Sequence, residues 1–120
     1  MGENLVKNMT VRDFAETLGC EILTGEVNLG EAVKAGYTSD LLSDVIAHAP
    51  ENSVWITVMR HINILGVAKL KDIVAIITPR NLKVESELIE KARIEGIALL
   101  RTPSSAFEIS GRVYEILKKG

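Results

Sequence analysis

The chain has little cysteine and none of the local motifs that mark the common enzyme families. Cys20 is the only cysteine among 120 residues, which excludes an internal disulfide and a cysteine cluster for a metal. A lone cysteine is typical of proteins from a reducing compartment, so we expect a cytoplasmic protein. We interpret Cys20 as a small buried apolar residue and not as a nucleophile.

Excess positive charge and long hydrophobic runs are also missing. Lysine and arginine total 14 against 16 aspartate and glutamate, and the two signs are interspersed, which disfavours binding to nucleic acid. The longest apolar runs, such as residues 73–77, are far shorter than the roughly 20 residues of a membrane span. The first ten residues do not resemble a signal peptide. We therefore expect neither nucleic acid nor a membrane as a partner.

Motifs for nucleotide, dinucleotide, acyl-transfer and zinc chemistry are absent as well. There is no Gly-x-x-x-x-Gly-Lys-Ser/Thr, Gly-x-Gly-x-x-Gly, Gly-x-Ser-x-Gly or His-Glu-x-x-His, and without such a motif scattered Ser, His and Asp residues predict no catalytic site. Asp40 and Asp44 share a helical face, but two carboxylates without a third ligand are a poor metal site. We predict no catalytic residue, no metal site and no cofactor.

What the sequence does contain is a spacing of apolar residues that changes repeatedly between the pattern of helices and the pattern of strands. With 47% hydrophobic residues in 120, it is long enough for one domain, residues 1–120, of which residues 1–8 are expected to be a flexible segment. Thr10 with Asp13, and Ser105 with Glu108, form capping-box patterns that mark two helix starts. We predict helices at 10–18, 40–48, 62–70, 84–95 and 105–118, and strands at 20–23, 31–37, 53–58, 72–77 and 97–100.

This alternation predicts an α/β fold in three layers, with a mostly parallel sheet of about five strands and helices on both faces. The strand at 72–77 has no polar alternation, as expected for a strand that is covered on both sides. In such folds ligands bind beyond the carboxyl ends of the strands, where helix N-termini favour anions. We therefore expect a small anionic ligand, such as a nucleotide, at that edge.

The candidate ligand-binding residues are those that follow the predicted strands. They are Gly36, Tyr37, Thr38, Ser39, Asp40, His61, Thr78, Arg80, Arg101, Ser104 and Ser105. Gly36 would let the backbone approach a ligand closely, whereas the arginines and His61 would meet a phosphate or carboxylate. Alternatives remain open, because Ser39 and Asp40 are also typical helix caps and both arginines are also typical of surface ion pairs.

Four segments together resemble the DRTGG domain family. They are GYTSDLLSDVIAHA at 36–49, NILG at 63–66, IVAIITPR at 73–80 and EGIALLRTPSSAFEISGRVYEIL at 95–117. This family is similar to the amino-terminal domain of HPr kinase/phosphorylase and recurs as a regulatory insert in some inorganic pyrophosphatases and phosphotransacetylases. The resemblance implies an α/β domain that accompanies catalytic domains and often pairs with itself. The Asp-Arg-Thr-Gly-Gly string that names the family is absent here.

Two hypotheses about function follow. The first is a non-catalytic regulatory and dimerisation module, a homodimer that senses a small anion or binds a regulatory or metabolic protein. In it, some apolar residues would cover a partner instead of the core, the candidates being Leu41, Leu42, Ile62, Ile64, Leu65 and Val67. The alternative is a small enzyme for phosphotransfer or hydrolysis, with Asp40 or His61 as the acid or base.

Overall fold

One five-stranded sheet forms the centre of the protein. A computed structural model describes residues 9–119, so the predicted flexible segment at 1–8 lies outside the described residues. The strand order is β1-β5-β4-β3-β2. Strands β2 to β5 are mutually parallel, and only β1 runs antiparallel, beside β5. The strands are β1 (Glu21–Ile22), β2 (Ala35–Thr38), β3 (Ser53–Ile56), β4 (Ala75–Thr78) and β5 (Ala98–Arg101).

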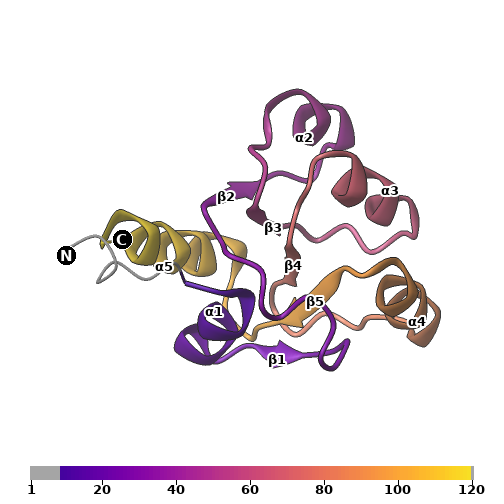
Figure 1. Ribbon diagram of the computed structural model, residues 1–120, viewed down its shortest axis with the longest axis horizontal. Helices are drawn as coiled ribbons and strands as arrows, with labels where there is room; N and C mark the ends of the chain where they lie inside the picture. The colour runs from indigo at the N-terminus through magenta and orange to yellow at the C-terminus, as the bar shows by residue number, and fades with distance from the viewer. Residues whose placement is uncertain (1–8, 120) are drawn as a thin grey trace.

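Helices cover both faces of this sheet. They are α1 (Val11–Leu18), α2 (Leu42–His48), α3 (Asn63–Leu70), α4 (Ser86–Glu95) and α5 (Ala106–Lys119). Helices α1 and α5 enclose one apolar cluster, and α2, α3 and α4 enclose the other on the opposite face (Figure 1). All residues of β3 and β4 are buried, because these central strands contact apolar side chains on both sides. The predicted three-layer α/β fold is confirmed.

The helix boundaries follow from local chemistry. At the start of α1, the Thr10 amide donates to the Asp13 carboxylate at 2.9 Å, and the Asp13 amide donates to the Thr10 hydroxyl at 3.1 Å. The Ser105 and Glu108 pair repeats this arrangement at the start of α5, with both bonds at 3.1 Å. Gly96 ends α4 in the left-handed conformation, φ 78°, which glycine adopts without steric cost. Both predicted capping boxes are confirmed.

Two predicted strands begin later than expected because their first residues bond elsewhere. Residues 31–33 pair with the segment before α1 instead of the sheet: the Val11 amide donates to the Glu31 carbonyl and the Val33 amide to the Met9 carbonyl. At 72–73, the chain is still closing α3, since Asp72 has a φ of 55° and the Ile73 amide donates to the Ala68 carbonyl; the Val74 amide already donates to the Ser53 carbonyl of β3. The alternation of helices and strands is unchanged by these shifts.

Three of the six apolar residues predicted as candidates to cover a partner are buried in the core. Ile64 is 1% exposed, and Leu65 and Val67 are also buried, because the inner face of α3 packs on the sheet; for these three the prediction was wrong. Leu41 is an exception at 63% exposure. Within residues 9–119, no helix combines the length and hydrophobicity needed to cross a membrane.

Candidate functional site

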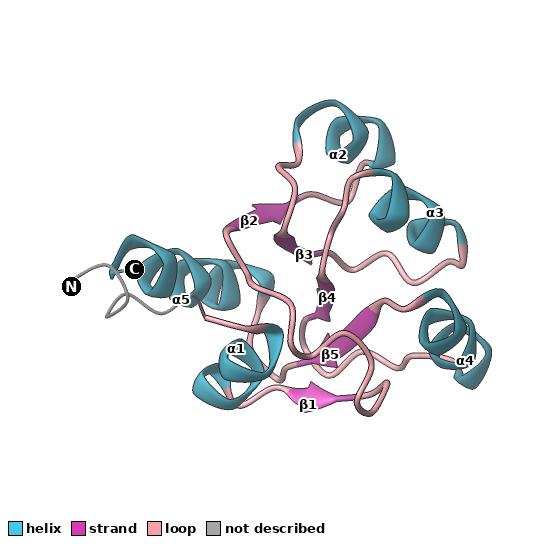
Figure 2. Cartoon of the chain, in the orientation of Figure 1, coloured by secondary structure: helices cyan, strands magenta, loops and turns pink. Residues whose placement is uncertain are grey.

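The carboxyl ends of four parallel strands meet at one edge of the sheet. We call this edge the strand-end rim; it consists of residues 39–41, 57–62, 79–85 and 102–105, which follow β2, β3, β4 and β5 (Figure 2). Most candidate residues from the sequence lie on or directly before this rim, because each parallel crossover returns the chain in the same direction.

Asp40 connects the loops that follow β2 and β3. Its Oδ1 atom accepts hydrogen bonds from the Thr57 hydroxyl at 2.8 Å and from the Val58 amide at 2.9 Å. Thr57 is only 1% exposed, so Asp40 satisfies a buried donor. Asp40 does not cap α2, whose N-cap position is held by Leu41 without a side-chain bond. Its role as a loop connector was not predicted, because Thr57 is distant in the sequence.

Tyr37 and Ser39 are held by residues of the α2 side. The Tyr37 hydroxyl donates to Asp44 at 2.8 Å, and this bond raises the pKa of Tyr37. Hydrogen bonds from Tyr37 and then Ser39, with the nearby charge of His48, lower the pKa of Asp44 despite partial burial. The fully buried Trp55 donates from Nε1 to the Ser39 carbonyl at 2.9 Å. Tyr37 and Ser39 thus have partners within the chain.

The loop that follows β3 carries His61 and a second basic residue, Arg60. His61 Nδ1 accepts from the amide of Asn63, the first residue of α3, at 3.2 Å. Arg60 donates to the Val58 carbonyl at 3.0 Å and to the Lys83 carbonyl at 2.8 Å. Arg60 therefore joins the loop that follows β3 to the loop that follows β4. Arg60 was not among the candidate residues predicted from the sequence.

The loops after β4 and β5 run side by side along the rim. The Thr102 amide donates to the Thr78 carbonyl at 2.9 Å, and the Arg80 amide donates to the Ser104 carbonyl at 2.8 Å. Arg80 and Asn81 both have positive φ, 58° and 49°, which is uncommon for residues other than glycine. The exposed Arg80 guanidinium has no hydrogen bond or ion pair within residues 9–119. It is an available cation at this edge.

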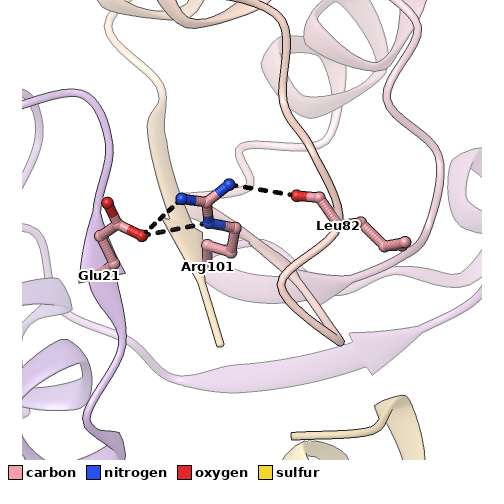
Figure 3. Close-up of polar contacts among 3 residues, drawn as sticks. All are labelled: Glu21, Leu82 and Arg101. Atoms are coloured by element: carbon pink, nitrogen blue, oxygen red, sulfur yellow. Dashed lines mark hydrogen bonds and ion pairs between the residues drawn. The ribbon is translucent and has the colours of Figure 1, made fainter. Parts of the chain in front are cut away.

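Arg101, in contrast, already has partners. Its Nη2 and Nε atoms donate to Glu21 Oε1 at 2.8 and 3.1 Å, and Nη1 donates to the Leu82 carbonyl at 3.4 Å (Figure 3). The guanidinium therefore connects β1 to the loop that follows β4. Its charge is balanced by a carboxylate, which corresponds to the ion-pair alternative for this residue.

Neither a metal site nor a reactive thiol emerges in the described part of the chain. Among residues 9–119, no group of three or more His, Cys, Asp or Glu side chains is placed to hold a metal ion. Burial raises the pKa of Cys20 to about 11, although the Arg112 charge partly opposes this shift. Because the thiolate is the nucleophile, Cys20 is a poor nucleophile at neutral pH.

A second region, beside β2, is apolar. A groove of about 1180 Å³ runs along α5 and is bordered by β2 and the end of α1. The Thr38 and Ser110 hydroxyls are hydrogen bonded at 2.7 Å, and a Cβ atom at Gly36 would lie 3.0 Å from a Val113 methyl group. Gly36 and Thr38, predicted as ligand residues, thus form the contact surface for α5.

The solvent-exposed side of α5 carries large apolar side chains. Phe107 is 89% exposed and Tyr114 is 64% exposed. Gly111 and Lys118, also exposed, occupy the same side of the helix at spacings of three and four residues. We call this set the outer stripe of α5: Phe107, Gly111, Tyr114 and Lys118.

Comparison with known proteins supports the fold. No family model matches the chain, and no curated protein matches it. Among solved structures, it is similar to the CBS and DRTGG domains of the regulatory region of a Clostridium perfringens pyrophosphatase, in complex with its activator diadenosine tetraphosphate. The identity is 17% and the TM-score is 0.64, over 85% of this chain and 44% of that one. This chain therefore matches less than half of that regulatory region.

Proposed function

We propose that this chain is a DRTGG-type regulatory domain that acts by association with a second copy and by sensing a small anion, without catalysing a reaction. Two lines of support converge on the family: four sequence segments resemble DRTGG domains, and a regulatory region that contains such a domain shares the fold. We take the DRTGG domain to be the part of that region that this chain matches.

The observation that carries the proposal is a contrast between two sets of side chains: the candidate acid and base residues are hydrogen bonded within the chain, whereas two large aromatic side chains are exposed to solvent. Asp40 and His61, the acid or base of the alternative enzyme hypothesis, accept hydrogen bonds from Thr57, Val58 and Asn63. A side chain that caps a loop or helix is held for a structural task. Phe107 and Tyr114, in contrast, extend large apolar surfaces into solvent, and such surfaces are typical of association sites.

For the anion we propose the part of the rim around Arg80. Its guanidinium is unpaired within residues 9–119. The Ser104 backbone lies beside the Arg80 backbone, since the Arg80 amide donates to the Ser104 carbonyl. Arginine binds phosphate through two parallel hydrogen bonds. By analogy with the pyrophosphatase regulatory region, whose activator is a dinucleoside tetraphosphate, we propose a nucleotide as the class of ligand.

Thermal unfolding in the presence of diadenosine tetraphosphate, ATP and inorganic phosphate tests this ligand role. A binder at 100 times its dissociation constant should stabilise the protein by about 2.7 kcal/mol, which raises Tm by several degrees. Arg80→Gln should abolish that shift, whereas Lys91→Gln, which removes one exposed charge from α4, should retain it. Unchanged Tm with all three compounds would reject the ligand role and leave association as the remaining function.

A further inference from the structure

The outer stripe of α5 concentrates exposed aromatic surface in a chain that has little of it. The sequence contains two Phe, one Trp and two Tyr. Phe14 and Trp55 are fully buried, whereas Phe107 and Tyr114 have 89% and 64% exposure. These two lie seven residues apart on one helix, so their side chains project on the same side, two turns apart.

Gly111 lies between these aromatic residues, one turn from each. A Cβ atom there would meet nothing within 4 Å beyond the nearby helix backbone, so no packing within residues 9–119 requires glycine. Glycine inside a helix costs about 1 kcal/mol relative to alanine. The missing side chain at Gly111 does, however, leave room for a large side chain from another helix to approach the α5 backbone.

We propose that the outer stripe of α5 packs antiparallel against the same stripe of a second copy of this chain, with Tyr114 over the partner's Gly111. A two-fold axis between positions 111 and 114 makes this contact twice, because the two residues exchange roles in the two copies. The same register places Phe107 level with the partner's Lys118. This inference rests on the dimerisation part of the proposed function and specifies its surface.

The charges of α5 favour a second copy over an unlike partner. Glu108 lies in the first turn, and Lys118 and Lys119 lie in the last. An antiparallel pair brings the acidic end of each helix to the basic end of the other, and it also aligns the helix dipoles favourably. Phe107 beside the partner's Lys118 adds a cation–π contact. The stripe is therefore complementary to itself.

The available area is consistent with a small specific interface. Large aromatic side chains bury about 150–250 Å² each. At their observed exposures, Phe107 and Tyr114 would together contribute roughly 600 Å² over both copies, about half of the ~1,200 Å² that the smaller stable complexes bury. The four stripe residues help to line the groove, and the rest of the groove and the outer edge of β2 supply further surface.

Light scattering and sedimentation over a range of protein concentrations test the surface. The unaltered chain should be a dimer, and Gly111→Gln, which fills the gap, should raise the dimer dissociation constant at least about tenfold. Ile94→Gln is the matched control, because Ile94 is 71% exposed on α4 and should leave the dimer intact. Urea unfolding should show that Gly111→Gln remains folded, since glutamine is a better helix former than glycine.

Mixed disulfide formation tests the register. Gly111→Cys and Tyr114→Cys chains, both also carrying Cys20→Ala, should form more mixed disulfide under mild oxidation than either chain forms with itself. A monomeric unaltered chain would reject dimerisation and this inference together. A dimer that Gly111→Gln leaves unchanged would overturn only the α5 surface, and equal mixed and self cross-linking would overturn the register.

Discussion

The strand-end rim and the outer stripe of α5 differ in whether their side chains have bonding or packing partners within the chain. On the rim or directly before it, Asp40, His61 and Arg101 all bond to loops, a helix start or a neighbouring carboxylate. On the outer stripe, Phe107 and Tyr114 extend into solvent around an open glycine. A polar residue beside a strand end can therefore be structural, whereas the outer stripe leaves large apolar side chains exposed.

The two sides of α5 differ in the same way: one side packs closely against β2, and the other is open to solvent. On the inner side, a Cβ atom at Gly36 would approach a Val113 methyl group to 3.0 Å, so β2 and α5 are in close contact. On the outer side, Gly111 has free space. Both positions are glycine, but only the inner one is explained by packing within the chain.

Substituting these two glycines should therefore change stability in opposite directions. Gly36→Val places branched methyl groups against Val113, and overpacking of this kind costs about 1–3 kcal/mol. Gly111→Ala removes a helix-interior glycine and should stabilise the monomer by about 1 kcal/mol. The measurement is urea unfolding at submicromolar protein, where association contributes least.

Gly30→Ala provides the control for this pair, because a Cβ atom at Gly30 also meets nothing within 4 Å and no helix is involved. Its free energy of unfolding should change by less than about 1 kcal/mol. Equal losses for Gly36→Val and Gly111→Ala would contradict the assignment of a packed inner side and an open outer side.

Loss of the Asp40 carboxylate should destabilise the rim. Asp40→Ala leaves the buried Thr57 hydroxyl without its acceptor and frees the Val58 amide. An unsatisfied buried polar group costs about 1–3 kcal/mol, so we expect a loss near 2 kcal/mol. Asp40→Asn retains an acceptor oxygen and should cost less than half as much.

Thermal and urea unfolding of both variants measure this difference, with Glu51→Ala as a control that removes an exposed carboxylate from a turn. If Asp40→Ala were as stable as the unaltered chain, the carboxylate would be free for another task, and the rim would no longer differ from the outer stripe. Loss of nucleotide binding without loss of stability would then assign Asp40 to the ligand.

The sequence was sufficient to predict the fold and the common edge, but not the bonds made there. Periodicity and capping boxes are local, so the helix at 105–118 was predicted to within a residue or two of its bounds. The bond from Thr57 to Asp40 spans 17 positions and that from Arg101 to Glu21 spans 80. Such partners depend on strand order, which no local pattern specifies.

The exposure of the outer stripe could not be predicted from the sequence either, although its spacing is local. Phe107 and Tyr114 have the same helical spacing as residues that face a core, so the sequence alone does not distinguish an outward from an inward position. Only the packing of Ile109 and Val113 against the sheet determines which side of α5 remains exposed. Gly111 was a visible signal, because a glycine inside a helix requires an explanation.

The smallest predicted effect concerns the hydrogen bond between Tyr37 and Asp44 at the boundary of the rim. This bond is the main cause of the lowered pKa of Asp44, so Tyr37→Phe should raise that pKa towards its ordinary value. The depressed pKa stabilises the folded state above the ordinary carboxyl pKa of about 4. That contribution decreases as the pH falls through the folded pKa, so the stability difference between Tyr37→Phe and the unaltered chain should narrow there.

The raised pKa of Tyr37 means that the same hydrogen bond also makes the stability depend on pH in the alkaline range. Its contribution is present below the ordinary tyrosine pKa of about 10 and decreases as the pH rises through the higher folded value. NMR titration of Asp44, together with unfolding at pH 3, at pH 7 and above pH 10, measures both effects. Tyr114→Phe, the same change on the outer stripe, should leave the Asp44 titration unmoved; an equal shift in both variants would show that the Tyr37 hydroxyl does not govern this carboxylate.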